Sequence, residues 1–210
     1  MFENASRVLG KHTIFAAMEN GKDFEKDIAA CLTSLQAGGL ILYPTDTIWG
    51  IGCDATNPDA VRKVYELKQR AESKSLIVLM ADQRDILKYT SQPDLRIFDF
   101  LKTVHKPTTV IYDGAIGLSP NLVNADGTIA IRLVDDNFCR HLIKRFRKPI
   151  VSTSANRSGE PAPAFYREID PHIIAGVDYV VHHRRDDNTA RQPSAIIKWN
   201  ATGKPTVIRP

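Results

Sequence analysis

A repeated alternation of helical and extended patterns limits the possible folds of this chain more than any other feature. From residue 22 to residue 37 apolar side chains recur at helical spacing and end at a Gly-Gly pair. Residues 40–43 then form a short apolar run that is typical of a buried strand. Asn57 followed by Pro58 is typical of the start of a second helix, and residues 76–80 indicate the next strand. This alternation favours an α/β protein, in which helices cover a sheet.

The rest of the chain continues this pattern and then changes. We expect helices over residues 94–104 and 136–147, and extended segments over residues 109–112, 128–134 and 150–153. Three later extended runs lack helices between them: residues 179–182, 195–199 and 206–208. A β-rich end after early alternation predicts a twisted mixed sheet rather than a purely parallel one. Because no linker interrupts residues 22–210, we expect one domain there, preceded by an N-terminal extension over residues 1–21.

Composition excludes several classes of protein. With 210 residues, 43% of them hydrophobic, the chain can bury a large core. It contains no apolar run near the roughly 18 residues of a membrane span and no secretory signal, so we expect a cytoplasmic protein with no membrane partner. The three cysteines form no CxxC pair and the histidines lack ligand spacing, so no metal site is predicted. A net charge of +4 mildly favours an anionic ligand such as a nucleotide or RNA.

Polar residues follow the first predicted strand in the segment YPTDTIWGIG, residues 43–52. Ligands of open α/β sheets gather at the carboxyl ends of strands, and hydroxyl groups such as those of Thr45 and Thr47 could bind a small polar molecule. The same hydroxyls could instead satisfy the backbone of their own turn. The residues alone leave both interpretations open.

A basic cluster lies at the end of the second predicted helix. Lys68, Arg70 and Lys74 fall within seven residues. Arginine offers a two-pronged donor and lysine a point charge, which are the two usual ways of holding phosphate. The alternative is a solvated helix end whose cations complement the helix dipole.

The third polar segment is STSANRSGEP, residues 152–161, which begins within the predicted strand 150–153 and continues past its end. Its hydroxyl and amide groups could surround a phosphate with donors. It is not a P-loop, because the pattern GxxxxGK[ST] is absent. A surface loop without a function is the alternative.

Taken together and in order, these segments resemble the YrdC family of threonylcarbamoyl-AMP synthases. Residues 38–52 are similar to the family's entry motif, residues 68–74 to its KxR…SK signature, and residues 149–161 to its most specific motif. Pro193-Ser194 and residues 207–210 are similar to its closing elements. The resemblance implies a twisted α/β sheet around a concave, positively charged cleft. It also implies that ATP with Mg²⁺, L-threonine and bicarbonate are substrates and that pyrophosphate is a product.

The resemblance also implies roles for particular residues. Threonine would contact Thr45, Ser152 and Ser194. Lys68 and Arg70 would be the catalytic cations. The nucleotide and its phosphates would contact these two and a further set: Lys74, Thr109, Arg132, Ser154, Asn156 and Arg209. Partner proteins would transfer the threonylcarbamoyl group to tRNA.

The chain departs from the family pattern at Ala71, at Ser75 and over residues 104–108, which changes the expected shape of the nucleotide end of the cleft. One alternative is therefore a paralogue without synthase activity, or a YrdC-like module that binds double-stranded RNA. Another is a carbamoyl-adenylating domain of a hydrogenase maturation protein, but the chain lacks the cysteine-rich zinc module that those proteins carry.

Overall fold

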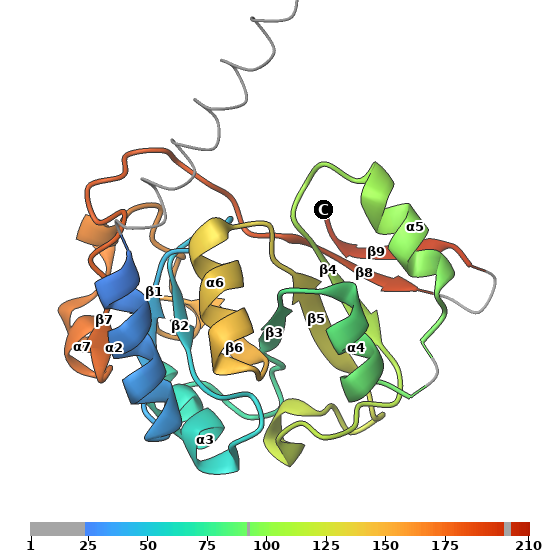
Figure 1. Ribbon diagram of the computed structural model, residues 1–210, viewed down its shortest axis with the longest axis horizontal. Helices are drawn as coiled ribbons and strands as arrows, with labels where there is room; N and C mark the ends of the chain where they lie inside the picture. The colour runs from blue at the N-terminus through green and yellow to red at the C-terminus, as the bar shows by residue number, and fades with distance from the viewer. Residues whose placement is uncertain (1–23, 92, 200–202) are drawn as a thin grey trace, which may run out of the picture.

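The computed structural model describes residues 24–91, 93–199 and 203–210, and in these residues nine strands form one mixed sheet (Figure 1). The strand order is β7-β1-β2-β6-β3-β5-β4-β8-β9. Three neighbouring pairs, β1/β7, β3/β5 and β4/β8, are parallel, and the other pairs are antiparallel. The prediction of a mixed α/β sheet is confirmed. The strands are β1 (Ile41–Tyr43), β2 (Gly50–Gly52), β3 (Ile77–Met80), β4 (Thr108–Tyr112), β5 (Ile129–Leu133), β6 (Ile150–Ser154), β7 (Tyr179–Val180), β8 (Ala195–Trp199) and β9 (Pro205–Arg209).

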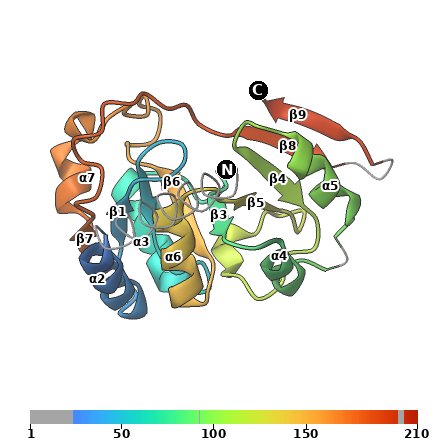
Figure 2. The same ribbon diagram turned by 45° about the horizontal axis from the view of Figure 1, so that its top comes forward.

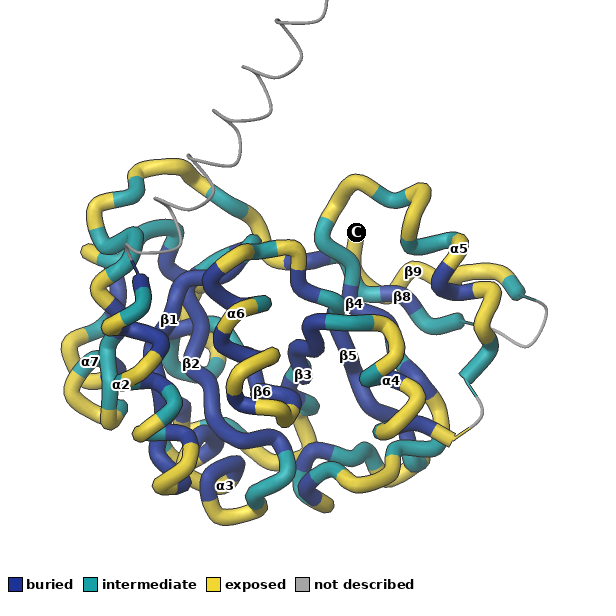
Figure 3. The backbone as a smooth tube through the Cα atoms, in the orientation of Figure 1, coloured by how far each residue is buried: buried dark blue, intermediate teal, exposed yellow. Residues whose placement is uncertain are grey.

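Helices pack against this sheet. They are α2 (Glu25–Gln36), α3 (Pro58–Lys68), α4 (Gln83–Tyr89), α5 (Arg96–Thr103), α6 (Asn137–Phe146) and α7 (Pro171–Ala175), with short 3₁₀ turns η1 (Pro120–Leu122) and η2 (Tyr166–Glu168). In Figures 1 and 2, α2, α6 and α4 pack in front of the central strands. The most deeply buried backbone in Figure 3 runs through β1, β2, β3, β5 and β6. No described helix is long and apolar enough to cross a membrane.

The start of α3 follows the sequence closely. The side-chain oxygen of Asn57 accepts hydrogen bonds from the backbone N–H groups of Asp59 and Ala60, and Pro58 occupies the first helical position. The helix ends where Gln69 takes a left-handed conformation with φ of 49°. This sharp stop turns the chain immediately after Lys68 and brings Arg70 back toward the sheet.

The register of the strands determines which side chains share one face of the sheet. Residues that pair directly across neighbouring strands point to the same side of a sheet. Ser152 pairs with Ile77 on β3, and Leu79, two residues further along β3, pairs with Arg132. Arg132 in turn pairs with Thr109, which pairs with Ile196. Polar residues from β6, β5 and β4 therefore lie on one face.

Two parts of the sequence interpretation need correction or fall outside the description. Residues 50–52, for which the sequence predicted no element, form strand β2, and at Gly52 a Cβ atom would stand 2.6 Å from the Tyr43 ring and 2.9 Å from the Val151 carbonyl oxygen. This glycine therefore permits close packing of strands. The expected N-terminal extension, residues 1–21, lies outside the described residues, and the domain boundary at residue 22 stays a prediction.

Candidate active site

A cleft of about 310 Å³ lies on the face of the sheet that carries Arg132 and Ser152. Segments distant in sequence meet there: the turn before β2, the starts of β3 and β8, the end of β6 and the end of β9. Ten of its lining residues carry polar side chains: Thr47, Arg70, Ser75, Arg132, Ser152, Thr153, Ser154, Asn156, Ser194 and Arg209. An eleventh, Glu160, is the only Asp or Glu among the described lining residues, against three arginines.

Lys68 lies beneath the loop that follows β6 and does not line the cleft. Its ammonium nitrogen is 2.5 Å from the carbonyl oxygens of both Ser154 and Asn156, and 3.4 Å from the side-chain oxygen of Asn156. The residue is only 1% exposed. Burial and, to a smaller extent, the nearby charge of Arg70 together lower the pKa of Lys68 to about 7. In this structure Lys68 holds the loop in place through these bonds and is not itself among the residues that line the cleft.

Arg70, by contrast, does line the cleft. Its Nε atom donates to the carbonyl oxygen of Lys74 and one terminal nitrogen donates to that of Ser75, each at 3.0 Å. Burial lowers the pKa of Arg70. Lys74 itself is exposed and outside the residues that line the cleft. The basic cluster therefore divides into a buried lysine, an arginine in the cleft wall and a lysine in solvent.

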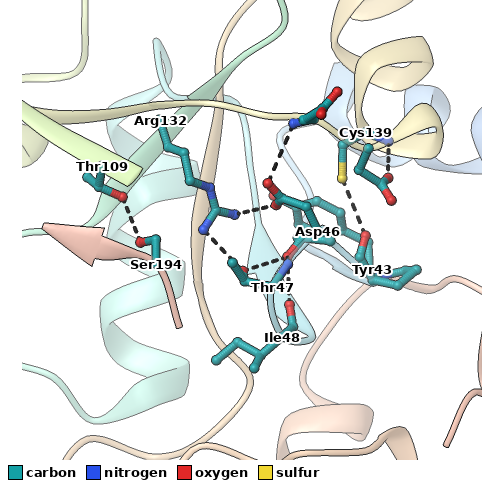
Figure 4. Close-up of polar contacts among 12 residues, drawn as sticks. Tyr43, Asp46, Thr47, Ile48, Thr109, Arg132, Cys139 and Ser194 are labelled. Atoms are coloured by element: carbon teal, nitrogen blue, oxygen red, sulfur yellow. Dashed lines mark hydrogen bonds and ion pairs between the residues drawn. The ribbon is translucent and has the colours of Figure 1, made fainter. Parts of the chain in front are cut away.

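Arg132 is fixed on the floor of the cleft by two residues of the PTDT segment (Figure 4). One terminal nitrogen lies 3.1 Å from a carboxylate oxygen of Asp46, and the other donates to the Thr47 hydroxyl at 3.0 Å. The Asp46 and Arg132 side chains are 9% and 4% exposed. Burial raises the pKa of Asp46, and the charge of Arg132 opposes this rise. The buried Nε atom of Arg132 has no hydrogen-bond partner among the described residues.

Thr45 takes part in a chain of hydrogen bonds that starts at Arg132. The Thr47 hydroxyl, which accepts from Arg132, lies 2.9 Å from the Thr45 hydroxyl, and Thr45 donates to the carbonyl oxygen of Ile48 at 2.8 Å. The Thr47 N–H also donates to the Thr45 hydroxyl. Thr45 is buried and borders a small hollow beside the cleft, whereas Thr47 lines the cleft itself. The hydroxyl of Thr45 thus satisfies the backbone of its own turn.

Ser194 and Arg209 form the wall of the cleft on the β8 and β9 side. The Ser194 hydroxyl lies 2.8 Å from that of Thr109, which is fully buried behind it (Figure 4). Arg209 donates to the Ser194 carbonyl oxygen from Nε at 3.1 Å and from a terminal nitrogen at 2.8 Å. Desolvation and the positive charge of Arg132 lower the pKa of Arg209, because the two guanidinium groups repel each other.

Ser152, Ser154 and Asn156 all line the cleft at the end of β6. The hydroxyl of Ser152 interacts with the buried phenol of Tyr43. The amide nitrogen of Asn156 donates to the carbonyl oxygens of Arg157 and Glu160 at 3.1 and 2.6 Å. The Ser154 hydroxyl makes no hydrogen bond with another described residue. Asn156 therefore shapes the loop, and Ser154 has a hydroxyl available for a ligand.

The sequence patterns did not assign a binding role to several residues of this site. Trp49 packs against Tyr166, with ring centroids 5.0 Å apart, and lines the cleft. The Ser75 hydroxyl bonds to Asn124, which anchors the start of β3. Only their position directly after a polar motif could have indicated them. The altered residues 104–108 border a different hollow, beside α5, and do not line the cleft.

Comparison with known proteins agrees with this architecture. The family model Sua5_yciO_yrdC, described as "Telomere recombination", matches residues 33–210. This chain belongs to the Sua5/YciO/YrdC family. A threonylcarbamoyl-AMP synthase of Vibrio parahaemolyticus is 34% identical over 169 residues, which cover 79% of this chain and 90% of the relative.

Solved members have the same fold. E. coli YciO superposes with a TM-score of 0.75 at 22% identity and covers 88% of both chains. P. abyssi Sua5, solved in complex with L-threonine, gives a TM-score of 0.74 at 21% identity over 87% of this chain and 53% of that one. The resemblance inferred from the motifs is thereby confirmed at the level of family and fold.

Proposed function

We propose that this protein is a nucleotidyltransferase that makes threonylcarbamoyl-AMP and pyrophosphate from L-threonine, bicarbonate and ATP, for the modification of tRNA. Support comes from the family and from a relative named threonylcarbamoyl-AMP synthase that matches most of this chain. The observation that carries the proposal is the meeting of three arginines with the hydroxyls of the PTDT and STSAN segments in one cleft.

The reaction has two steps. The amine of threonine attacks bicarbonate, forming a C–N bond with loss of water, and gives an N-carboxylated threonine. An oxygen of this new carboxylate then attacks the α-phosphorus of ATP, and the bond to the bridging oxygen breaks as pyrophosphate leaves. Both reactants of the second step are anions, so the barrier is largely electrostatic. Cations fixed in advance around the reacting groups lower such a barrier, and holding the reactants in line adds a proximity effect.

Arg70, Arg132 and Arg209 are the cations placed for this task, since all three line the cleft. Arg132 is held by Asp46 and Thr47, and each of the other two is held by backbone carbonyl oxygens, so the guanidinium groups are already oriented. We assign Ser154 and Asn156 to the nucleotide side with Arg70. In this proposal Lys68 acts through the loop that it supports.

The threonine would lie near Ser152, Ser194 and the turn of the PTDT segment. The P. abyssi protein of the same fold was solved with L-threonine, which supports an amino acid site in this fold. The Thr45 hydroxyl satisfies its own turn, so we propose that the neighbouring Thr47, which faces the cleft, takes the direct contact. Thr109 would contribute by fixing the Ser194 hydroxyl.

Mg²⁺ would arrive with ATP. Among the described residues no group of three or more His, Cys, Asp and Glu side chains could hold a metal ion. Mg²⁺ commonly binds substrate phosphates and waters with only one or two protein carboxylates, and Glu160 is positioned to be such a carboxylate. The residues therefore fit an ion that the nucleotide brings, whose role would be to neutralise phosphate charge.

Pyrophosphate release tests the proposal. The protein is incubated with ATP and Mg²⁺, with and without L-threonine and bicarbonate, and the adenylate product is identified by mass spectrometry. We expect pyrophosphate only when both are present, because the acyl group requires both. ATP turnover that is equal without threonine would refute the assignment. Salt-sensitive RNA binding without ATP turnover would instead support the RNA-binding alternative. Transfer to tRNA by partner proteins and a cytoplasmic location remain part of the proposal.

A further inference from the structure

A second hollow of about 320 Å³ lies on the helix-covered side of the sheet, between α4 and the end of α6. Four cationic side chains line it: Lys88, Lys144, Arg147 and Lys148. Met80, Ile143 and Tyr89 supply apolar surface. Met80 follows Leu79 on β3, and because side chains alternate along a strand it points to the face opposite Arg132. None of the residues that line this hollow lines the cleft.

The charge around this hollow is only partly neutralised. Lys88 pairs with Asp85 at 2.8 Å, and Lys148 pairs with Asp54 at 2.6 Å. Within the described part of the chain, neither the Lys144 ammonium nor the Arg147 guanidinium makes a hydrogen bond or ion pair. The local sequence is also positively charged, since residues 137–148 contain five lysines and arginines and no aspartate or glutamate. Asp85 also lines the hollow, and the charge of Lys144 acts on the nearby Asp82 carboxylate. Because no acidic group of the described chain binds Lys144 or Arg147 directly, both side chains can contact an anion.

Arg147 adds a second, independent observation. It ends α6 in a left-handed conformation with φ of 60°, a position where glycine is favoured because it has no Cβ atom. Arg147 therefore lies at the rim of this hollow in a backbone conformation that costs any residue with a Cβ atom some free energy. Cations near a helix end also complement the helix dipole, but that purpose needs neither strain at the cap nor a hollow with an apolar wall.

We propose that this hollow is a binding site for a small molecule that carries a phosphate group on an apolar or aromatic body. Lys144 and Arg147 contact the phosphate. Tyr89, Ile143 and Met80 contact the body. The phenol of Tyr89 makes no hydrogen bond with another described residue, so it can also donate to the ligand. The size of the hollow equals that of the cleft and falls within the usual range of small-molecule sites. This site is separate from the proposed chemistry.

Phenyl phosphate is a suitable probe, with binding measured by calorimetry at low salt. Loss of a charge-assisted contact typically weakens binding tenfold or more, so we expect Lys144→Ala and Arg147→Gly each to do so. Arg147→Gly should melt no lower than the wild type, because glycine adopts the left-handed conformation without strain. Weakened binding in this variant therefore cannot be explained by unfolding.

Two matched controls locate the binding. Arg140→Ala removes a cation of the same helix that pairs with Asp135, and Arg70→Ala removes one from the cleft. Both should bind phenyl phosphate within about twofold of wild type. Unchanged binding in both hollow variants, or loss of binding in Arg70→Ala, would overturn the proposal. Equal affinities for inorganic phosphate and phenyl phosphate would also overturn the proposal. Binding of an RNA duplex that requires Lys144, in a protein that does not bind phenyl phosphate, would overturn it as well.

Discussion

The ammonium nitrogen of Lys68 lies 2.5 Å from the carbonyl oxygen of Asn156, so the last residue of α3 and the loop after β6 form one buried polar unit. The Ser158 N–H completes it by donating to the Lys68 carbonyl oxygen at 2.8 Å. These two segments are 86 and 88 residues apart in sequence at their points of contact. The two segments belong to separate motifs of the family, and the structure gives a reason for their joint presence: Lys68 supports the loop after β6.

Stability should depend on pH through Lys68. Burial lowers the pKa of its ammonium group from 10.5 to about 7. Between these values the unfolded chain binds one more proton than the folded protein, so raising the pH favours the folded state. We expect the difference in free energy of unfolding between wild type and Lys68→Met to shift in favour of wild type as pH rises from 7 to 10. Urea titrations across this range measure it, and a difference that stays flat would show that the buried amine is protonated throughout.

Arg70 and Lys74 should behave differently although the sequence places them in one cluster. Arg70 lines the cleft, and Lys74 is exposed outside it. Arg70→Ala should weaken ATP binding by about one to two powers of ten, the usual effect of losing a charge-assisted contact. Lys74→Ala is the matched control and should leave affinity within about twofold. Calorimetry with ATP and Mg²⁺ compares them, and equal losses would mean that only general positive charge matters.

The buried pair of Asp46 and Arg132 should show strong energetic coupling. Removing one partner leaves the other charge buried without compensation, which typically costs about 3–5 kcal/mol. We expect Asp46→Leu and Arg132→Leu each to destabilise the protein by about this amount, and the double variant by less than their sum. Denaturant unfolding gives the three values. Arg140→Ala breaks the exposed pair with Asp135 and should cost at most about 1 kcal/mol. Additive effects at Asp46 and Arg132 would refute the coupling.

Much of the fold could be predicted from local patterns. Residues 40–43, 76–80 and 150–153 were correctly expected to be strands, because continuous apolar runs bounded by polar turns have few alternatives. Helix α4 was missed because its seven residues give less than two turns of periodicity. Strand β2 was missed because its glycines suggest a loop. Only its place between β1 and β6, where Tyr43 and Val151 leave no room for a side chain, explains them.

The site was less accessible to sequence reasoning than the fold. Motifs identified segments that meet in the cleft, but not the depth of each side chain. Lys68 and Arg70 are two residues apart, yet one is buried and the other lines the cleft, because the chain reverses at Gln69. Asp46 and Arg132 lie 86 positions apart, and no local pattern indicates that they pair. Such contacts depend on strand order, which local sequence patterns do not determine.

Ser154 and Asn156 should separate catalysis from loop stability. Both line the cleft, but the Ser154 hydroxyl has no partner in the described chain, whereas Asn156 bonds to two carbonyl oxygens and lies near Lys68. Ser154→Ala should therefore melt near wild type and lose pyrophosphate release by roughly ten- to a thousandfold, as expected for one lost stabilising donor. Asn156→Ala should lose activity and also about 0.5–2 kcal/mol of stability, the usual effect of a lost side-chain to backbone bond. Melting temperature and pyrophosphate release are measured on the same samples. A Ser154→Ala protein that loses stability in proportion to its activity would leave the hydroxyl a purely structural role, and the nucleotide side of the cleft would then consist of Arg70 and Asn156.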